Sequence, residues 1–318
     1  MGVYEKMNEY TEALKSRIAS VIVGKDEVIE HVITALIAGG HVLLEDLPGT
    51  GKTMLAKSLA GSINAGFARI QFTPDLLPSD ITGIHVYRPQ TGDFELKVGP
   101  VFAQILLADE INRATPRTQA ALLECMEEHQ VTLDGETLGL NEPFFVIATQ
   151  NPIENAGTFP LPEAQLDRFF MKLSMGSMSA EDELAMLERF EAGRPLDEIT
   201  PIMDAASVLE MKAQAERVFI HPVLKRYIVD LCRGTREMPR ILAGASPRAE
   251  LVMMACAKAL AYVRGRDYVV PEDIKELAVP VLSHRLVLSA ELKRNGGPDI
   301  VVKQVLKMIS LPTEDWRG

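Results

Sequence analysis

The sequence contains little cysteine, and neither its cysteines nor its histidines are clustered. Its 318 residues include three cysteines, Cys125, Cys232 and Cys256, which are odd in number and far apart. This spacing argues against a disulfide framework or a cysteine metal site, and it is typical of small buried side chains in a reducing compartment. The six histidines show no metal-binding spacing, so we predict no structural metal site.

A signal peptide and a long apolar run are also missing. Charged residues interrupt the N-terminal stretch MGVYEKMNEYTEALKSRIASVIVG throughout, and it has no apolar segment of the kind that a signal peptide carries. No stretch of the chain approaches the roughly 20 apolar residues that a membrane helix needs. We therefore expect a cytoplasmic protein without membrane insertion.

An excess of positive charge is lacking as well. The chain has 33 Lys and Arg residues against 44 Asp and Glu residues, which gives a formal net charge of -11. Because nucleic-acid phosphates attract positively charged surfaces, this balance disfavours nucleic-acid binding as the main activity. We expect a protein partner instead.

What the sequence does contain is a candidate phosphate-binding loop at residues 46–53, DLPGTGKT. Gly51, Lys52 and Thr53 fit the end of the pattern G-x-x-x-x-G-K-S/T, whereas Asp46 stands where the pattern has its first glycine. The apolar run HVLLE precedes the loop, and MLAKSLAGSINA follows with apolar residues at helical spacing. A glycine-rich hairpin would need a second strand there. The order strand, loop, helix favours a nucleotide-binding loop.

In such a loop each residue type has a chemical task. Backbone N–H groups surround the phosphates, the lysine reaches the β and γ phosphates, and the hydroxyl group binds magnesium. We therefore predict that ATP and Mg²⁺ are bound by Pro48, Gly49, Thr50, Gly51, Lys52, Thr53 and Met54, with Thr53 as a metal ligand.

Two further apolar runs end in polar residues that suit the same chemistry. The run ILLAD ends in Asp109 and continues with Glu110, a pair that can hold magnesium and activate water, although carboxylates also favour helix N-termini. The run FFVIATQNP ends in Gln150 and Asn151, where an amide can position the attacking water or simply form an Asn-Pro turn. We predict Asp109 as a metal ligand, with Glu110 and Asn151 as catalytic residues.

The wider pattern predicts two domains. Short apolar runs alternate with helical segments up to residue 176, which indicates an α/β domain whose parallel sheet is covered on both faces. From residue 177 to residue 318 the strand signal disappears and helical patterns follow one another, several with proline near the first turn. Ser179 and Asp182 resemble a capping box at the start of this helical region.

The segments LLEDLPGTGKT, LLADEINRATPRTQAALLECMEE, FFVIATQNPIENAGTFPLPEAQLDRFFMK and GASPRAE together resemble the MoxR family of AAA+ ATPases over nearly the whole chain. The resemblance implies a P-loop nucleotide domain followed by an all-helical lid. It also implies that Asn151 is sensor 1, that Arg168 is the arginine finger and that Arg248 is sensor 2. Val23 and Gly24 match the segment that contacts adenine.

Without the resemblance, these arginines have simpler interpretations. Arg168 follows Asp167, and an adjacent acid-base pair is most often a solvated surface pair. Arg248 would be an ordinary exposed cation at a helix start. Arg113, four residues after Asp109, is a further candidate for a nucleotide or interface sensor.

The resemblance also implies how the protein works. It predicts a homo-oligomer, a hexameric ring with ATP sites between subunits, that remodels a partner protein or matures its metal centre. A protein with a von Willebrand factor A domain is the expected partner. The hairpins predicted at Thr91-Gly92 and Asp134-Gly135 would face that partner or the ring axis, or would be plain surface loops. A nucleic-acid motor and a metal-chelatase subunit remain as alternative functions.

Overall fold

The predicted α/β fold is confirmed by a five-stranded sheet in the computed structural model, which describes residues 3–47, 49–152, 157–294 and 296–311, with side chains from residue 9 onward. The strand order is β2-β5-β8-β1-β9, and all four neighbouring pairs are parallel. The strands are β1 Val42–Glu45, β2 Phe67–Gln71, β5 Ile105–Asp109, β8 Phe145–Gln150 and β9 Met171–Leu173.

The three central strands of the sheet, β5, β8 and β1, are apolar on both faces, because helices cover the sheet on both sides. On β1, Val42 and Leu44 pack into the cluster that includes the helices of the C-terminal half, whereas Leu43 packs into a second cluster on the other face. The same alternation places Leu107 of β5 in the first cluster and Leu106 in the second. The continuous apolar runs in the sequence therefore follow from a parallel sheet that is buried on both faces.

The helices fall into three groups along the chain. The first group belongs to the α/β domain: α1 Val3–Ala19, α2 Asp26–Ile37, α3 Lys52–Ser62, α4 Pro78–Thr82, α5 Pro116–Glu128 and α6 Glu163–Leu166. A middle group, α7 Ala180–Ala192 and α8 Ala205–Ala215, connects the sheet to the C-terminal region. The last group forms the lid: α9 Pro222–Glu237, α10 Pro247–Val263, α11 Pro271–Leu282, α12 Ala290–Arg294 and α13 Gly297–Met308.

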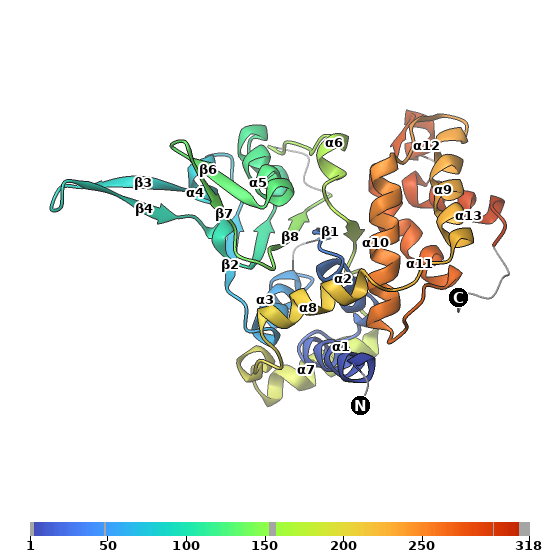
Figure 1. The fold of residues 1–318 in the computed structure, drawn as a ribbon, viewed down its shortest axis with the longest axis horizontal. Coiled ribbons are helices and arrows are strands. Elements are labelled where there is room, and N and C mark those ends of the chain that lie inside the picture. Colours follow the sequence, from blue (N-terminus) through green and yellow to red (C-terminus); the bar gives the residue numbers. More distant parts are fainter. Residues whose placement is uncertain (1–2, 48, 153–156, 295, 312–318) are drawn as a thin grey trace.

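Two hairpins project from the α/β domain (Figure 1). The longer one pairs β3 Gly83–Arg88 with β4 Asp93–Val98 and extends away from the rest of the molecule. The shorter one pairs β6 Gln130–Leu133 with β7 Glu136–Gly139 and turns at Asp134 and Gly135. Nδ1 of His85 in β3 lies 2.7 Å from a carboxylate oxygen of Asp134, so the two hairpins touch near the base of the longer one.

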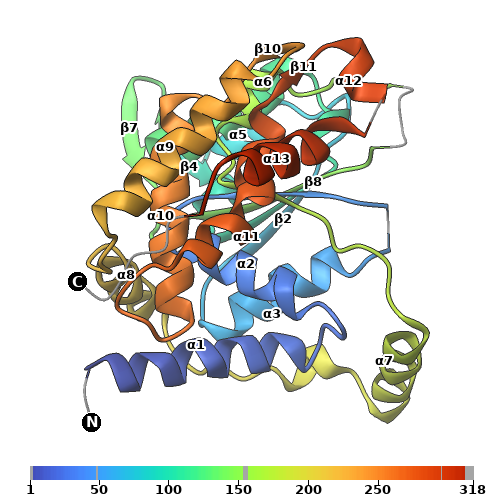
Figure 2. The ribbon, with the colours of Figure 1, turned by 90° about the vertical axis from the view of Figure 1, so that its right-hand side faces the viewer.

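The lid differs from the prediction in one detail, because it also contains two short strands. β10 Ile241–Ala243 and β11 Val287–Leu288 form an antiparallel pair beside the helices. Strands of two or three residues are too short to show the alternation that sequence reading depends on. Figure 2 shows the lid helices stacked above α1 and α2, with α7 at the other end of the molecule.

The middle group lies against the α/β domain. The Arg189 guanidinium of α7 donates hydrogen bonds of 2.7 Å to the carbonyl oxygens of Ala19 and Ser20, at the end of α1. The expected capping box is present, since the Ser179 hydroxyl accepts the backbone N–H of Asp182. The domain boundary after residue 176 stays a prediction.

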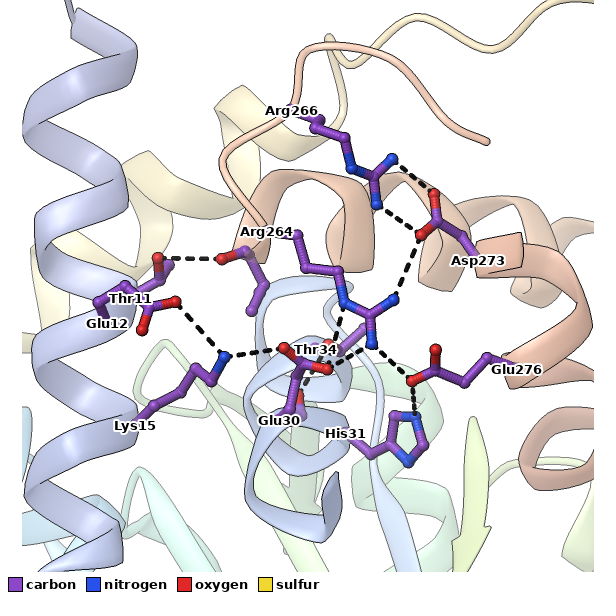
Figure 3. Close-up of polar contacts among 11 residues, drawn as sticks. Thr11, Glu12, Lys15, Glu30, His31, Thr34, Arg264, Arg266, Asp273 and Glu276 are labelled. Carbon is purple, nitrogen blue, oxygen red and sulfur yellow. Dashed lines mark hydrogen bonds and ion pairs between the residues drawn. The ribbon is translucent and has the colours of Figure 1, made fainter. Parts of the chain in front are cut away.

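A charged network joins the N-terminal helices to the lid (Figure 3). The Arg264 guanidinium lies 2.6 Å from Glu30 of α2 and 2.7 Å from Glu276 of α11. Lys15 of α1 binds the other oxygen of Glu30 at 2.9 Å, and His31 lies 3.3 Å from Glu276. Because the network is only partly exposed, it ties α1, α2 and the lid together more firmly than a surface ion pair would.

None of the described helices is long and apolar enough to cross a membrane.

Candidate functional site

The loop between β1 and α3 has the backbone that a phosphate cradle requires. Gly49 and Gly51 have φ angles of 87° and 89°, a left-handed conformation that glycine adopts without strain. A Cβ atom at Gly49 would meet nothing within 4 Å, so the concave side of the loop is open. α3 begins at Lys52, and the free N–H groups and the dipole of its first turn favour an anion at this position. Pro48, the first predicted cradle residue, lies outside the described residues.

The Lys52 side chain folds back over the loop. Its ammonium group donates hydrogen bonds to the carbonyl oxygens of Asp46, at 2.9 Å, and Leu47, at 3.1 Å. The positive charge is therefore held at the mouth of the cradle, where a phosphate oxygen would compete for it.

Asp46, the mismatch to the first glycine of the pattern, points away from the cradle. Its carboxylate accepts hydrogen bonds from the Ser174 hydroxyl and the Met175 backbone N–H, both at 2.7 Å, and from the Gly176 N–H at 3.4 Å. The side chain is buried. Asp46 thus fixes the start of the loop to the segment that follows β9, and its charge is satisfied by donors on that side.

Asp109 and Glu110 lie at the carboxyl end of β5, and Thr149 of β8 contacts both. The Thr149 hydroxyl donates to an Asp109 carboxylate oxygen at 2.6 Å and accepts the backbone N–H of Glu110 at 2.8 Å. Glu110 has a φ angle of 58°, which is unusual for a residue other than glycine. The Thr149 hydroxyl therefore orients the Asp109 carboxylate and supports Glu110 in a backbone conformation that it would not adopt freely.

Residues of β2 and of the turn after Glu110 complete the polar contacts. Arg69 binds Asp109 through its Nη2 at 2.7 Å, and Gln71 donates to a carboxylate oxygen of Glu110 at 2.8 Å. Arg113 binds the same oxygen of Glu110 at 2.9 Å. Both carboxylates are thus held in defined orientations at the edge of the sheet where ligands bind in α/β proteins.

These elements surround a cavity of about 400 Å³. Asn151, which follows β8, lies on its wall together with Lys52, Thr53, Asp109 and Glu110. The lining residues are Asp46, Gly49, Thr50, Gly51, Lys52, Thr53, Met54, Arg69, Gln71, Asp109, Glu110, Thr149, Gln150 and Asn151. The structure thus brings together most of the residues that the sequence predicts for nucleotide and metal binding.

The predicted adenine segment, Val23 and Gly24, precedes α2 beside this cavity. Ile22 lies 3.8 Å from the position that a Cβ atom of Gly51 would occupy. Gly24 packs against α7, because a Cβ atom there would lie 2.4 Å from the Asp182 carboxyl carbon. The segment therefore runs between the phosphate cradle and the start of α7.

Arg168 and Arg248 do not line the cavity of their own chain. Arg168 lies just before β9, near the amino end of the sheet, since the nearby Phe170 N–H bonds the carbonyl oxygen of His41, which precedes β1. The cradle follows the carboxyl end of β1, whereas Arg168 lies near the amino ends of the strands. The four residues of β1, at ~3.3 Å per residue, separate these two ends of the sheet by roughly 13 Å.

The two arginines meet on one carboxylate, that of Glu127 near the end of α5. Arg168 Nε lies 3.0 Å from one Glu127 oxygen, and Arg248 Nη1 lies 2.9 Å from the other. A hydrogen bond from Arg248 and the charge of Arg168 lower the pKa of Glu127, although burial acts in the opposite direction. Glu127 is therefore ionised at neutral pH.

Sequence reading did not identify Thr149, Arg69, Gln71 or Glu127. Thr149 carried a usable signal, because it immediately precedes Gln150, the polar last residue of β8, and β8 lies next to the strand that ends in Asp109. Arg69 and Gln71 alternate along β2 and reach the same edge, but exposed polar residues also alternate on strands that carry no site. Glu127 carried no local signal, since Arg248 is 121 residues away along the chain.

Comparison with known families gives two matches. The model of the ATPase family associated with various cellular activities (AAA) matches residues 41–171. The model of the AAA lid domain matches residues 233–304, which fall within the helical C-terminal half.

Individual relatives match the chain over most of its length. The chain is 44% identical to the protein YeaC of Bacillus subtilis, over 99% of this chain and 98% of that protein. It is 42% identical to Chaperone MoxR1 of Mycobacterium tuberculosis, over 93% of this chain and 80% of that protein. It is 30% identical to Protein MoxR of Methylorubrum extorquens, over 93% of both chains.

A solved structure from Cytophaga hutchinsonii, described as that of a proposed ATPase, superposes with a TM-score of 0.91. The two chains are 39% identical, and the match covers 98% of this chain and 97% of the other.

Proposed function

This chain belongs to the MoxR family of AAA+ ATPases and hydrolyses ATP, and we propose that it does so at the interfaces of a hexameric ring of identical subunits. One observation carries this proposal. Arg168 and Arg248 lie together near the amino ends of the strands, whereas the cradle lies at their carboxyl ends. Their charges are therefore too far from the ATP site of their own chain to contact its phosphates. In a ring they would serve the site of the next subunit.

The cavity residues suit ATP with a magnesium ion. The backbone N–H groups of residues 49–53 would surround the phosphates, and Lys52 would leave the loop carbonyls to bind the β and γ phosphates. The Thr53 hydroxyl and the Asp109 carboxylate line the same cavity and would hold Mg²⁺, which neutralises charge on the phosphates when bound.

The donor set fits this ion. Within the described residues, no three His, Cys, Asp or Glu side chains gather as a metal cluster, so the protein would supply few ligands. Magnesium typically takes one or two carboxylates and fills the remaining positions with phosphate oxygens and water.

Glu110 is the proposed base that activates water, and Asn151 would orient that water from the neighbouring strand. Gln71 and Arg113 hold the Glu110 carboxylate and would have to release it before it takes a proton from the water that attacks the γ-phosphate. The arginines would arrive from the neighbour and stabilise the charge of the transition state. An arginine finger is worth ~10³- to 10⁵-fold in rate in related enzymes, so hydrolysis should depend on assembly.

Mixing two inactive variants tests the shared site. Arg168→Ala lacks the supplied arginine, and Glu110→Gln lacks the base. A mixed ring contains interfaces where an intact Glu110 meets an intact Arg168, so activity should return. No recovery between differently tagged subunits that demonstrably co-purify in one ring would refute hydrolysis at a shared interface.

The work of hydrolysis is proposed to fall on a separate protein. The formal net charge of -11 disfavours nucleic acid as the target, and the two hairpins that project from the nucleotide domain offer surface for a protein. By family resemblance, a protein with a von Willebrand factor A domain is the proposed partner, and remodelling or metal-centre maturation is the proposed outcome. Because ATP is supplied there, we also propose a cytoplasmic location.

Glu110→Gln also provides the test for the partner. It should keep ATP bound while slowing water attack, so the ring should retain the partner from lysate in ATP and release it in ADP. Retention of DNA-associated proteins alone, together with ATPase activity stimulated by single-stranded DNA, would favour a nucleic-acid motor. Co-purification with a larger chelatase complex would favour that alternative.

A further inference from the structure

Glu127 lies at the point where two distant parts of the chain bring positive charge together. Arg168 comes from the turn between α6 and β9, and Arg248 comes from the first turn of α10 in the lid. Each guanidinium binds a different oxygen of the Glu127 carboxylate, at 3.0 Å and 2.9 Å. Two like charges this close repel each other unless an opposite charge lies between them.

Asp167, the carboxylate next to Arg168 in the chain, is already paired with another arginine. Asp167 lies 2.6 Å from Arg285, whose side chain is only 2% exposed, and it approaches Arg248 no closer than 3.9 Å. Arg285 also donates to the carbonyl oxygen of Phe169, which fixes the lid to the turn before β9. In the described part of the chain, Glu127 is therefore the carboxylate that pairs with both Arg168 and Arg248 at hydrogen-bonding distance.

The cluster of Arg168, Arg248 and Glu127 keeps N–H donors and positive charge with which it could bind an anion. Two guanidinium groups and one carboxylate leave a net charge of about +1, and each arginine carries five N–H donors of which Glu127 occupies few. Arg168 is bound through Nε, which leaves both of its terminal nitrogens for a planar contact with a phosphate group. Glu127 thus orders the arginines and occupies only Nε of Arg168 and Nη1 of Arg248, which leaves the other N–H groups to recognise an anion.

We propose that Glu127 is a positioning residue for the ATP site of the neighbouring subunit, because its carboxylate holds Arg168 and Arg248 side by side so that both meet the same triphosphate. This inference rests on the proposed function, in which the arginines act across the interface. Glu127 does not touch the nucleotide. It acts through the two arginines and links the position of the lid to that of the arginine finger.

The first test compares Glu127→Gln with Glu128→Gln, which removes the same charge one residue further along α5. Glu127→Gln should lower the kcat of the assembled enzyme roughly 10- to 100-fold, as misplaced catalytic groups generally do. Its ATP affinity should stay unchanged, because the cavity lies at the other edge of the sheet. Glu127→Asp keeps the charge with a shorter reach and should fall in between. Circular dichroism and ring assembly check that each variant is folded.

The second test asks which site Glu127 serves. Glu127→Gln should regain activity when it is mixed with Glu110→Gln. It should regain none when it is mixed with Arg168→Ala, because Glu127→Gln and Arg168→Ala both damage the surface that supplies the arginines. Full activity in Glu127→Gln alone, a higher kcat, or recovery with Arg168→Ala would each overturn the inference. Failure of Arg168→Ala and Glu110→Gln to complement each other would remove the shared site itself and this role with it.

Discussion

The Thr149 hydroxyl lies 2.6 Å from the Asp109 carboxylate and donates a hydrogen bond to it across two neighbouring strands. The same oxygen accepts the N–H of Glu110, so one side chain fixes both acidic residues. We expect Thr149→Val, which has the same shape without the hydroxyl, to lower kcat while ATP affinity changes little. Thr149→Ser keeps the hydroxyl and should restore most of the rate. Steady-state ATPase assays of the two variants check this, and equal rates in both would contradict it.

Lys52→Ala should weaken ATP binding because it removes the cation at the mouth of the cradle. Charge-assisted hydrogen bonds are worth about 1.5–3 kcal/mol, so the dissociation constant should rise roughly 10- to 100-fold. Calorimetry measures the affinity. Lys57→Ala, which removes an exposed lysine from the same helix, is the matched control and should bind ATP normally.

Asp46→Gly restores the glycine of the common loop pattern, yet we expect it to destabilise the protein. The change removes a buried carboxylate and leaves the donors of Ser174 and Met175 without their acceptor, at a cost of about 1–3 kcal/mol. Denaturant unfolding measures the loss. Asp46→Asn retains one acceptor oxygen and should lose less, whereas a stable Asp46→Gly would show that the carboxylate is dispensable.

The network around Arg264 should make stability depend on acid pH. The hydrogen bond from His31 and the Arg264 guanidinium hold the pKa of Glu276 at about 2, against an ordinary value of 4.5. Because this pKa is lower in the folded state, the contribution is complete above the ordinary value and is lost as the pH falls from about 4.5 to 2.

Arg264→Gln should reduce that acid sensitivity and lower stability at neutral pH. Thermal unfolding across this pH range measures both effects. Arg226→Gln removes an exposed pair with Asp230 and serves as the control, which should leave the pH profile unchanged. Parallel profiles for wild type and Arg264→Gln would contradict the role of the network.

The long hairpin should provide contact area for the proposed partner. Tyr87 and Phe94 face each other across it, and they are 52% and 70% exposed. Replacing both with serine should weaken retention of the partner by ATP-locked rings roughly 30-fold, the effect of a typical interface hot spot. Val86→Ser, on the opposite face of the hairpin, is the control. ATP affinity should not change in either variant.

The nucleotide cradle could be predicted because its signal is local. Residues 46–53 carry the loop pattern, and the flanking strand and helix are visible in the neighbouring residues. The ends of β5 and β8 were equally visible, because buried parallel strands read as apolar runs and their polar ends stand out.

The remaining features depend on contacts between distant segments. The partners of Asp46 lie 128 to 130 residues away along the chain, so its departure from the pattern had no visible reason in the sequence. The meeting of Glu127 with Arg168 and Arg248 depends on where the lid docks, which helical periodicity does not encode. β10 and β11 were missed because they are too short to produce a pattern.

The cradle lies at the carboxyl ends of the strands and the arginines lie near the amino ends, and this arrangement restricts the symmetry of the assembly. In the proposed assembly each subunit contacts one neighbour through the surface that carries its cradle and the other neighbour through the surface that carries its arginines. Such a contact is head-to-tail. A two-fold dimer brings identical surfaces together and cannot build such a contact. Successive head-to-tail contacts either close or grow into a helix. An open assembly has one complete site fewer than it has subunits, so closure alone completes the last site.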